Sequence, residues 1–314
     1  MDKIPVKKFI PVMLTPFTDN GSIDFDGLTR LTEMYLNAGV QGLFANCQSS
    51  EMYELSDEEK LQVVNHVMKI AEGSVPVVAV GNFGKTISEQ AEFIKRIYGT
   101  GVQAVIIVTS LIAKATEEPD VFEGRIFQLF DLTGKIPLGF YECPEPYKRL
   151  LTPKQLAKFV ATGRIIYHKD TCLDIAQVRE KLEATNGYPS FGLYDAYAVN
   201  AVDSLNAGAA GLSCIQGNFF PELIVWLCEH YNHKGNKDQV NDVQEFLNDN
   251  MEVVHTSYPM AAKYYLKKSG LNISTYTRNR SGNMTSSMEK KLDDLFIQYN
   301  RLKKEIEIPE LKLM

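Results

Sequence analysis

The strongest constraint on this chain is an alternation of short apolar segments with longer helical patterns, which runs from residue 9 to about residue 215. The apolar segments are bounded mostly by Gly, Pro or polar residues, as short buried strands are. The expected strands are Phe9–Leu14, Gly42–Ala45, Val75–Val80, Ala104–Val108, Ile136–Tyr141, Ile165–Lys169, Ser190–Tyr194 and Gly211–Ile215.

The segments between the expected strands carry signals of helix starts. Three of them have the spacing of a capping box, namely Ser56 with Glu59, Thr86 with Glu89, and Thr152 with Gln155. Strict alternation of strands and helices calls for a parallel sheet, and this number of repeats favours closure over an open sheet. The sequence therefore predicts an α/β fold of the (β/α)₈ TIM-barrel class.

The chain after about Phe219 looks helical to its end. Phe219–His230 fits the last barrel helix, and further helices are expected at Gln239–Val254, Tyr258–Lys268 and Ser287–Glu305. These helices are too closely spaced for an independent domain. We expect the barrel to span residues 1–235, with a C-terminal helical extension at 236–314 packed on it as part of one structural unit.

Composition excludes several classes of protein. A net charge of −6 argues against a nucleic-acid partner, which would require a basic face. No apolar run of about 18 residues occurs, so no membrane span is expected. Met1–Lys8 has no signal-peptide layout, and the five cysteines fit reduced thiols better than a disulfide framework. Together these features predict a cytoplasmic location.

A lysine ends the sixth expected strand, where active sites of this fold class lie. Side chains alternate along a strand, so Ile165, Tyr167 and Lys169 should share one face, and Ile166 and His168 the other. Ile and His suit contact with helices, which directs Lys169 into the barrel mouth. Desolvation there lowers the pKa of an amine toward the neutral form that attacks a carbonyl. From its position alone, Lys169 could instead be a lysine whose amine extends to solvent.

Two other strand ends carry candidate groups. Tyr141 points inward if Phe140 faces the helices, and its phenol can transfer protons; the alternative is a core aromatic residue. The second strand leads into the segment 46–51, which is rich in small hydrogen-bond donors that could bind a carboxylate.

These residues occur within a longer set of motifs. The set comprises Pro11–Phe17 with Gly21 and Asp24, Ser49–Glu51 through Leu55 and Glu58–Lys60, Tyr141 with Pro144, and Lys169–Thr171. In order and spacing, the chain resembles the dihydrodipicolinate synthase and N-acetylneuraminate lyase family of class I aldolases over nearly its whole length. The resemblance implies that Lys169 is the Schiff-base nucleophile and Tyr141 the proton-transfer residue. It also implies no metal or organic cofactor, and a homo-oligomer, either a tetramer or a dimer.

The resemblance also assigns the carboxylate of a 2-oxo acid to the loop after the second strand. The family pattern there is Gly, two hydroxyl residues, Gly and Glu, whereas this chain has Cys47-Gln48-Ser49-Ser50-Glu51. Ser49 keeps a hydroxyl and Gln48 can donate from its amide. We therefore expect Ser49, Gln48 and Ser50 to bind substrate.

Thr171 and Asp195 are similar to residues of the sugar-acid lyases in this family, where they meet substrate hydroxyls. For Asp195, capping of the following helix is an equal alternative. The chain departs from the synthases at Ser110–Ile112, where they have a tyrosine, and near Pro146, where they have an arginine. The resemblance thus implies a lyase acting on a 2-oxo acid or sugar acid. The alternatives are a dehydratase using the same lysine and a non-catalytic, small-acid-binding paralogue.

The cysteines and histidines are the candidate ligands for a soft metal ion. Cys47, Cys143, Cys172 and Cys214 fall at or just beyond strand ends, but no CxxC pair or suitable histidine spacing accompanies them. Packing is favoured over a soft-metal site. The histidines, including His168, are interpreted as surface or packing residues.

Overall fold

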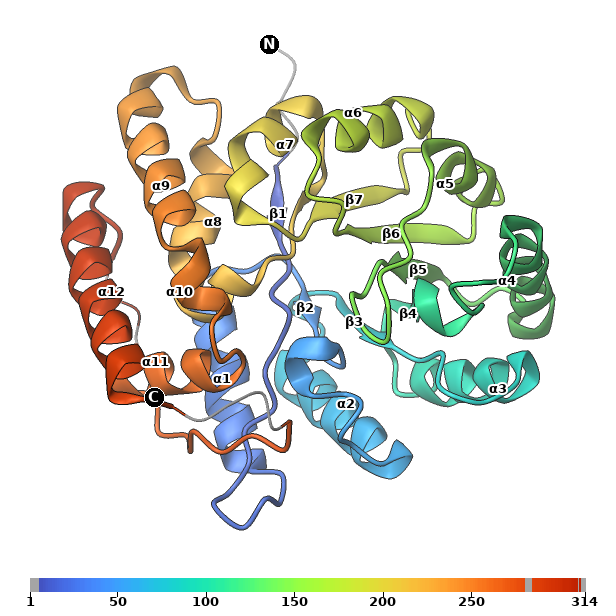
Figure 1. The fold of residues 1–314 in the computed structure, drawn as a ribbon, viewed down its shortest axis with the longest axis horizontal. Helices are drawn as coiled ribbons and strands as arrows, with labels where there is room; N and C mark the ends of the chain where they lie inside the picture. The colour runs from blue at the N-terminus through green and yellow to red at the C-terminus, as the bar shows by residue number, and fades with distance from the viewer. Residues whose placement is uncertain (1–5, 280–283, 310, 312–314) are drawn as a thin grey trace.

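Eight parallel strands form the centre of the molecule (Figure 1). The computed structural model describes residues 6–279, 284–309 and 311. The strands pair in the order β1-β8-β7-β6-β5-β4-β3-β2, and a parallel bridge between Val12 and Phe44 closes the remaining gap. The strands are β1 (Lys8–Phe9), β2 (Leu43–Phe44), β3 (Val77–Val80), β4 (Ala104–Val108), β5 (Leu138–Tyr141), β6 (Ile165–Asp170), β7 (Gly192–Asp195) and β8 (Gly211–Leu212). The predicted (β/α)₈ barrel is confirmed.

Helices surround the strands as an outer ring (Figure 1). The predicted capping boxes are present at Ser56, Thr86 and Thr152, where each side chain accepts a backbone N–H from the first turn. The ring consists of α1 (Phe25–Asn37), α2 (Asp57–Ala71), α3 (Ile87–Tyr98), α4 (Pro119–Thr133), α5 (Pro153–Val160), α6 (Ile175–Ala184), α7 (Ala201–Ala207) and α8 (Pro221–His230).

The first strand is shorter than the predicted Phe9–Leu14. Regular pairing covers only Lys8 and Phe9, and the chain then meets β2 through the single bridge at Val12. Pro11 has no N–H to donate to a ladder, and its carbonyl instead accepts from the Phe44 N–H at 3.0 Å. The barrel is therefore closed by a few hydrogen bonds rather than by a full ladder.

The two faces of the sheet bury different clusters. The interior cluster includes Phe44, Tyr141, Tyr167 and Tyr194, whereas the helix-facing core includes Ile165. The prediction that Ile165 shares a face with Lys169 is wrong. Pairing of β5 with β6 shifts between Leu138 and Gly139, and this irregularity changes the alternation at the start of β6.

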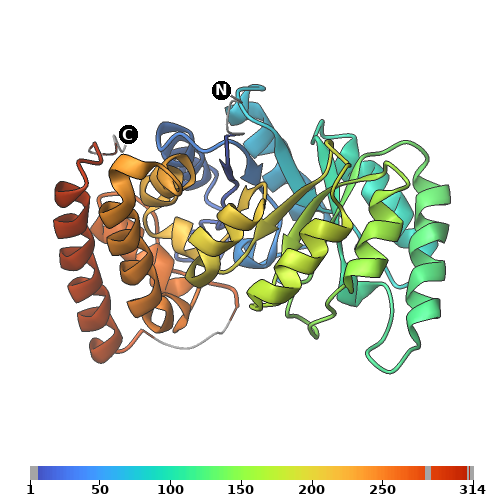
Figure 2. The same cartoon turned by 90° about the horizontal axis from the view of Figure 1, so that it is seen from above.

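The chain after α8 continues as helices on one side of the barrel, away from α3 to α5 (Figures 1 and 2). These are α9 (Lys237–Asp249), α10 (Met251–His255), α11 (Met260–Lys268) and α12 (Ser286–Glu305). The prediction of one helix over Gln239–Val254 is wrong, because Asn250 separates α9 from α10. The Asn250 amide donates to the Phe246 carbonyl at 2.9 Å, a local bond with which asparagine competes with helix continuation.

Ion pairs join this extension to the barrel, among them Lys303 of α12 with Glu222 of α8 at 3.3 Å. Lys263 of α11 donates to Glu51 at 2.8 Å with both side chains fully buried, and Arg278 pairs with Glu59 at 2.6 Å. Within the described ranges, no helix has the length and apolar character needed to cross a membrane.

Candidate active site

A cavity of about 280 Å³ lies at the carboxyl ends of the strands. Five of the residues predicted from the sequence line it: Gln48, Ser49, Tyr141, Lys169 and Thr171. The C-terminal extension contributes further lining residues that the sequence did not indicate, namely His255, Tyr258, Pro259 and Asn279. The cavity is therefore built jointly by the barrel and the extension.

Lys169 is buried on the inner face of β6, with only 3% of its surface exposed. Its Nζ lies 4.3 Å from the centre of the Tyr141 ring. Burial lowers the pKa of Lys169, and the nearby thiols of Cys47, Cys143 and Cys214 oppose this only in part. Among the described residues, no carboxylate contributes to that pKa. The amine is thus biased toward its neutral, nucleophilic form.

Tyr141 lies on the neighbouring strand β5, directly opposite Lys169 in the pairing of the two strands. Its phenol donates to Gln48 Oε1 at 3.2 Å, and Cys143 Sγ donates to the same oxygen at 3.6 Å. Burial raises the pKa of Tyr141, so the phenol remains protonated at neutral pH. Because its carbonyl oxygen is used internally, Gln48 can offer a bound anion only its amide N–H groups.

The two serines of this loop lie in different surroundings. Gln48–Ser50 forms a 3₁₀ turn, η1, and Ser49 lines the cavity, as Tyr258 does. The Ser50 hydroxyl lies 2.7 Å from the Met13 carbonyl and 2.9 Å from the Ala45 carbonyl, to which it donates. Ser50 is fully buried and is not among the residues that line the cavity. The turn brings together Gln48 and Ser49, and it directs Ser50 into the backbone beneath them.

Thr171 and Asp195 also lie in different places, one at the cavity and one on the helix-facing side of the sheet. Thr171 lines the cavity, and its hydroxyl donates to the Glu142 carbonyl at 2.6 Å. Asp195 is paired with Asp170, one residue beyond Lys169, and so lies on the helix-facing side of the sheet. Its carboxylate accepts the Tyr197 N–H at 2.8 Å at the start of a 3₁₀ turn, a contact of the capping kind. The structure does not bring Asp195 to the cavity.

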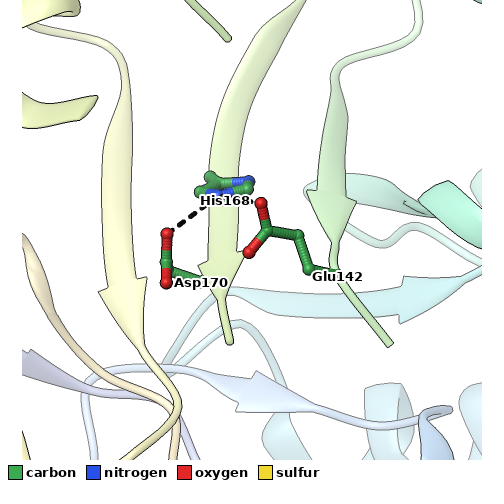
Figure 3. A group of neighbouring side chains, drawn as sticks. All are labelled: Glu142, His168 and Asp170. Atoms are coloured by element: carbon green, nitrogen blue, oxygen red, sulfur yellow. Dashed lines mark ion pairs between the residues drawn. The ribbon is translucent and has the colours of Figure 1, made fainter. Parts of the chain in front are cut away.

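Behind the cavity lies a group of buried charged side chains that sequence reasoning missed. Lys181 of α6 donates to Glu142 at 2.7 Å and to Asp170 at 2.6 Å. The His168 ring lies between the same two carboxylates, with its Nε2 3.5 Å from each (Figure 3). We call Glu142, His168, Asp170 and Lys181 the buried quartet. Strand alternation from Tyr141 and Lys169 places its first three members together, but nothing local in the sequence places Lys181.

The members of the quartet shift one another's pKa values. Burial acts to lower the pKa of Lys181, but Glu142 and Asp170 outweigh it and the pKa is raised. The pKa of His168 is raised in the same way, against burial, chiefly by Glu142. Burial alone would raise the pKa of Asp170, yet His168 and Lys181 hold it well below its usual range. The ammonium of Lys181 and the His168 ring therefore face two carboxylates, and all four side chains are buried.

Three ligand atoms of the quartet, from Glu142, His168 and Asp170, lie within 4.8 Å of one another, as metal ligands would. Lys181 already donates to both carboxylates, so the positive charge that an ion would supply is provided by the protein itself. The group thus fits an internal ion pair better than a metal centre. It contains none of the cysteines considered from the sequence.

Comparison with known proteins identifies relatives of this chain. A model of the Dihydrodipicolinate synthetase family matches residues 5–298. A 4-hydroxy-tetrahydrodipicolinate synthase from Shewanella sp. (strain ANA-3) is 28% identical over 220 residues, which cover 70% of this chain and 73% of the relative. A protein of the same name from Marinobacter nauticus is 25% identical over 264 residues, covering 82% and 87% of the two chains.

Solved structures share the fold at low sequence identity. One is YagE, a prophage protein of the dihydrodipicolinic acid synthase family from E. coli K12, whose structure was solved in complex with pyruvate. It superposes on this chain with a TM-score of 0.84 at 22% sequence identity, and the match covers 94% of this chain and 98% of YagE. A monomeric dihydrodipicolinate synthase variant gives 0.84 at 19%, covering 94% and 97%. The match to the family model spans most of the chain, and the chain belongs to the dihydrodipicolinate synthetase family.

Proposed function

We propose that this protein is a Schiff-base lyase that acts on pyruvate or a related 2-oxo acid, with Lys169 as nucleophile. Membership of the family makes it an enzyme of the class I aldolase type. The observation that carries the specific proposal is the state of Lys169, which is buried and lies in a cavity beside Tyr141, with a lowered pKa to which no carboxylate of the described residues contributes. Burial without a counter-charge favours the neutral amine needed for attack on a carbonyl.

The reaction begins with attack of the Lys169 amine on the C2 carbonyl to give a carbinolamine. Loss of water, with a proton supplied to the leaving hydroxyl, gives an iminium ion. Cleavage of the C3–C4 bond places its electron pair on the iminium, while the C4 hydroxyl loses a proton and becomes an aldehyde. The enamine is then protonated at C3, and water releases the 2-oxo acid and the free lysine. Tyr141, protonated and opposite Lys169, is suited to the proton transfers.

The remaining lining residues favour a small substrate with few charges. Ser49 and the Gln48 amide are the proposed partners of the carboxylate, and Thr171 lies where it could meet a substrate hydroxyl. Arg149 is directed away, with its guanidinium bonded to the Lys114 carbonyl at 2.7 Å. A cavity of about 280 Å³ suits a short-chain acid rather than a nucleotide.

The proposal is tested by borohydride reduction in the presence of pyruvate, followed by peptide mass analysis. We expect a lactyl group on the peptide that contains Lys169 and none on the peptide that contains Lys181, which is equally buried but bonded to two carboxylates. Lys169→Ala should abolish the adduct. No adduct with pyruvate or with longer 2-oxo acids would contradict the lyase proposal and favour the non-catalytic paralogue.

The type of reaction, the oligomeric state and the identity of the substrate stay predictions. A dehydratase would form the same adduct, so the products from sugar acids must be analysed to separate elimination from carbon–carbon cleavage. A homo-oligomer is also expected, as a tetramer or dimer, and sedimentation analysis of the purified chain would test it. Pyruvate or a sugar acid is the expected small-molecule partner.

A further inference from the structure

The C-terminal extension brings a tyrosine hydroxyl to the cavity. Tyr258 precedes α11 and lines the cavity together with Ser49. Its phenol oxygen accepts a hydrogen bond from Asn218, in the 3₁₀ turn η4 (Ile215–Asn218) after β8, and Ser49 is among the side chains that act on its pKa. Gln48 occupies the neighbouring position of the loop and has no hydroxyl. Tyr258 therefore supplies a second hydroxyl beside Ser49.

The hydrogen bonds of Asn218 determine where the Tyr258 proton can go. The Asn218 amide nitrogen donates to the Val12 carbonyl at 2.8 Å, and since a carbonyl can only accept, this contact fixes the orientation of the amide. The same nitrogen donates to the Tyr258 oxygen at 2.5 Å, and the Asn218 carbonyl accepts from the Tyr35 phenol. Because the Tyr258 oxygen is the acceptor from Asn218, its own proton is left for Ser49 or for a ligand in the cavity.

We propose that Tyr258 is a substrate-binding residue that donates, together with Ser49, to the carboxylate of the 2-oxo acid. This inference rests on the Schiff-base function proposed above. A carboxylate accepts several hydrogen bonds at once, so it can take the protons of both hydroxyls that line the cavity. Burial raises the pKa of Tyr258, and the phenol therefore stays a donor throughout the working pH range.

A purely structural role for Tyr258 makes a different prediction. If its phenol only holds the extension against η4, its loss would disturb the cavity for any ketone, charged or not. If it donates to the carboxylate, its loss would weaken binding of pyruvate selectively. Methyl pyruvate provides the comparison, because it has the same keto group without the negative charge.

The experiment measures the rate of borohydride-trapped adduct formation against ketone concentration for Tyr258→Phe. We expect the half-saturating concentration of pyruvate to rise about 10- to 100-fold, the range for loss of one hydrogen bond to a charged group. For methyl pyruvate we expect a change of about twofold or less, since an ester carbonyl is a weaker, uncharged acceptor. Tyr265→Phe is the matched control, because it removes a buried phenol from α11 that does not line the cavity.

Ser49→Ala provides a second route if Tyr258→Phe does not fold, and it should show the same selectivity for pyruvate. Equal weakening of both ketones, or an unchanged dependence on pyruvate in Tyr258→Phe, would overturn the assignment while leaving the Schiff-base function intact. Absence of any adduct in the wild-type protein would overturn both. These outcomes separate failure of the inference from failure of the proposed function.

Discussion

Two fully buried lysines, on opposite faces of the same part of the sheet, are held in opposite ways. Lys169 points from β6 into the barrel, and no carboxylate contributes to its lowered pKa among the described residues. Lys181 reaches from α6 to the outer face of the strands, donates to Glu142 and Asp170, and has a raised pKa. Both side chains are at most 3% exposed. Burial is common to both, so the difference lies in their counter-charges.

The comparison separates two uses of a buried amine. Ion pairing compensates the cost of desolvating Lys181 and ties β5, β6 and α6 together. Lys169 lacks such compensation, and the cost of burial instead appears as a shift toward the neutral amine. A buried amine of this kind is expected to lower the free energy of unfolding while remaining nucleophilic. The sequence places Lys169 directly between two members of the quartet, His168 and Asp170, so one short strand contains both arrangements.

The largest expected effect is on stability, from Lys181→Met. Methionine keeps most of the side-chain volume but leaves two carboxylates buried without their main cation, which should cost about 3–5 kcal/mol of unfolding free energy. Denaturant unfolding followed by circular dichroism measures this change. Lys158→Met is the control, because Lys158 pairs with Glu123 at the surface and should lose about 1 kcal/mol or less. Equal losses of unfolding free energy in the two variants would show that the buried ion pairs of Lys181 contribute no more than a surface pair.

A carboxylate introduced beside Lys169 should raise the pKa of its amine, as Glu142 and Asp170 do for Lys181. Cys143 contributes to the electrostatic surroundings of Lys169, and Cys143→Asp would place a negative charge there. An opposite charge favours the ammonium form, so adduct formation with pyruvate at pH 7 should slow by about tenfold or more. The pH at which trapping is half-maximal should rise. Cys143→Asn has nearly the same shape without the charge; a similar slowing in that variant would show that shape, not charge, is responsible.

Lys169→Met should change the free energy of unfolding in the opposite direction to Lys181→Met. It removes an amine that no carboxylate of the described part of the chain compensates, so it should abolish the adduct and stabilise the fold by about 1–2 kcal/mol. The folded state holds Lys169 with a lowered pKa, so the unfolded chain binds more protons below pH 10.5. The wild-type protein is therefore penalised at lower pH, and the gain from the substitution should shrink as pH rises toward 10.5. A loss of stability at pH 7 would show that Lys169 has a compensating partner after all.

Strand alternation explains how much of this could be predicted from the sequence. It predicts that Tyr141 and Lys169 face the same interior, because both lie at the ends of strands whose pairing is regular there. It fails at Ile165, where the irregular pairing of β5 and β6 depends on the neighbouring strand rather than on local composition. The barrel itself was predictable because each strand and helix signal is local and the repeats are many.

The remaining parts of the site depend on contacts between distant segments. Ser50 is held inward by the carbonyls of Met13 and Ala45, and the sequence of the loop does not reveal the contact with distant Met13. Lys181 joins the quartet through the docking of α6, and Tyr258 reaches the cavity through the packing of the extension. A local pattern of residue types does not show which distant segments come into contact. Only part of the quartet had a local signal, since His168 and Asp170 flank Lys169 in the sequence.

The smallest expected effect on stability comes from Asp195. Lys181 lowers the pKa of this carboxyl only slightly. Burial raises its pKa to about 7, while its ordinary value is 3.8. The folded state thus binds this proton more tightly than the unfolded chain, and Asp195 reduces stability as pH rises from about 4 to about 7. Asp195→Asn keeps an oxygen for the Tyr197 N–H and should stabilise the protein by about 1 kcal/mol at pH 8, with little effect at pH 4. Thermal unfolding at the two pH values measures the difference, and a stabilisation of equal size at both would assign the effect to packing rather than to the buried charge.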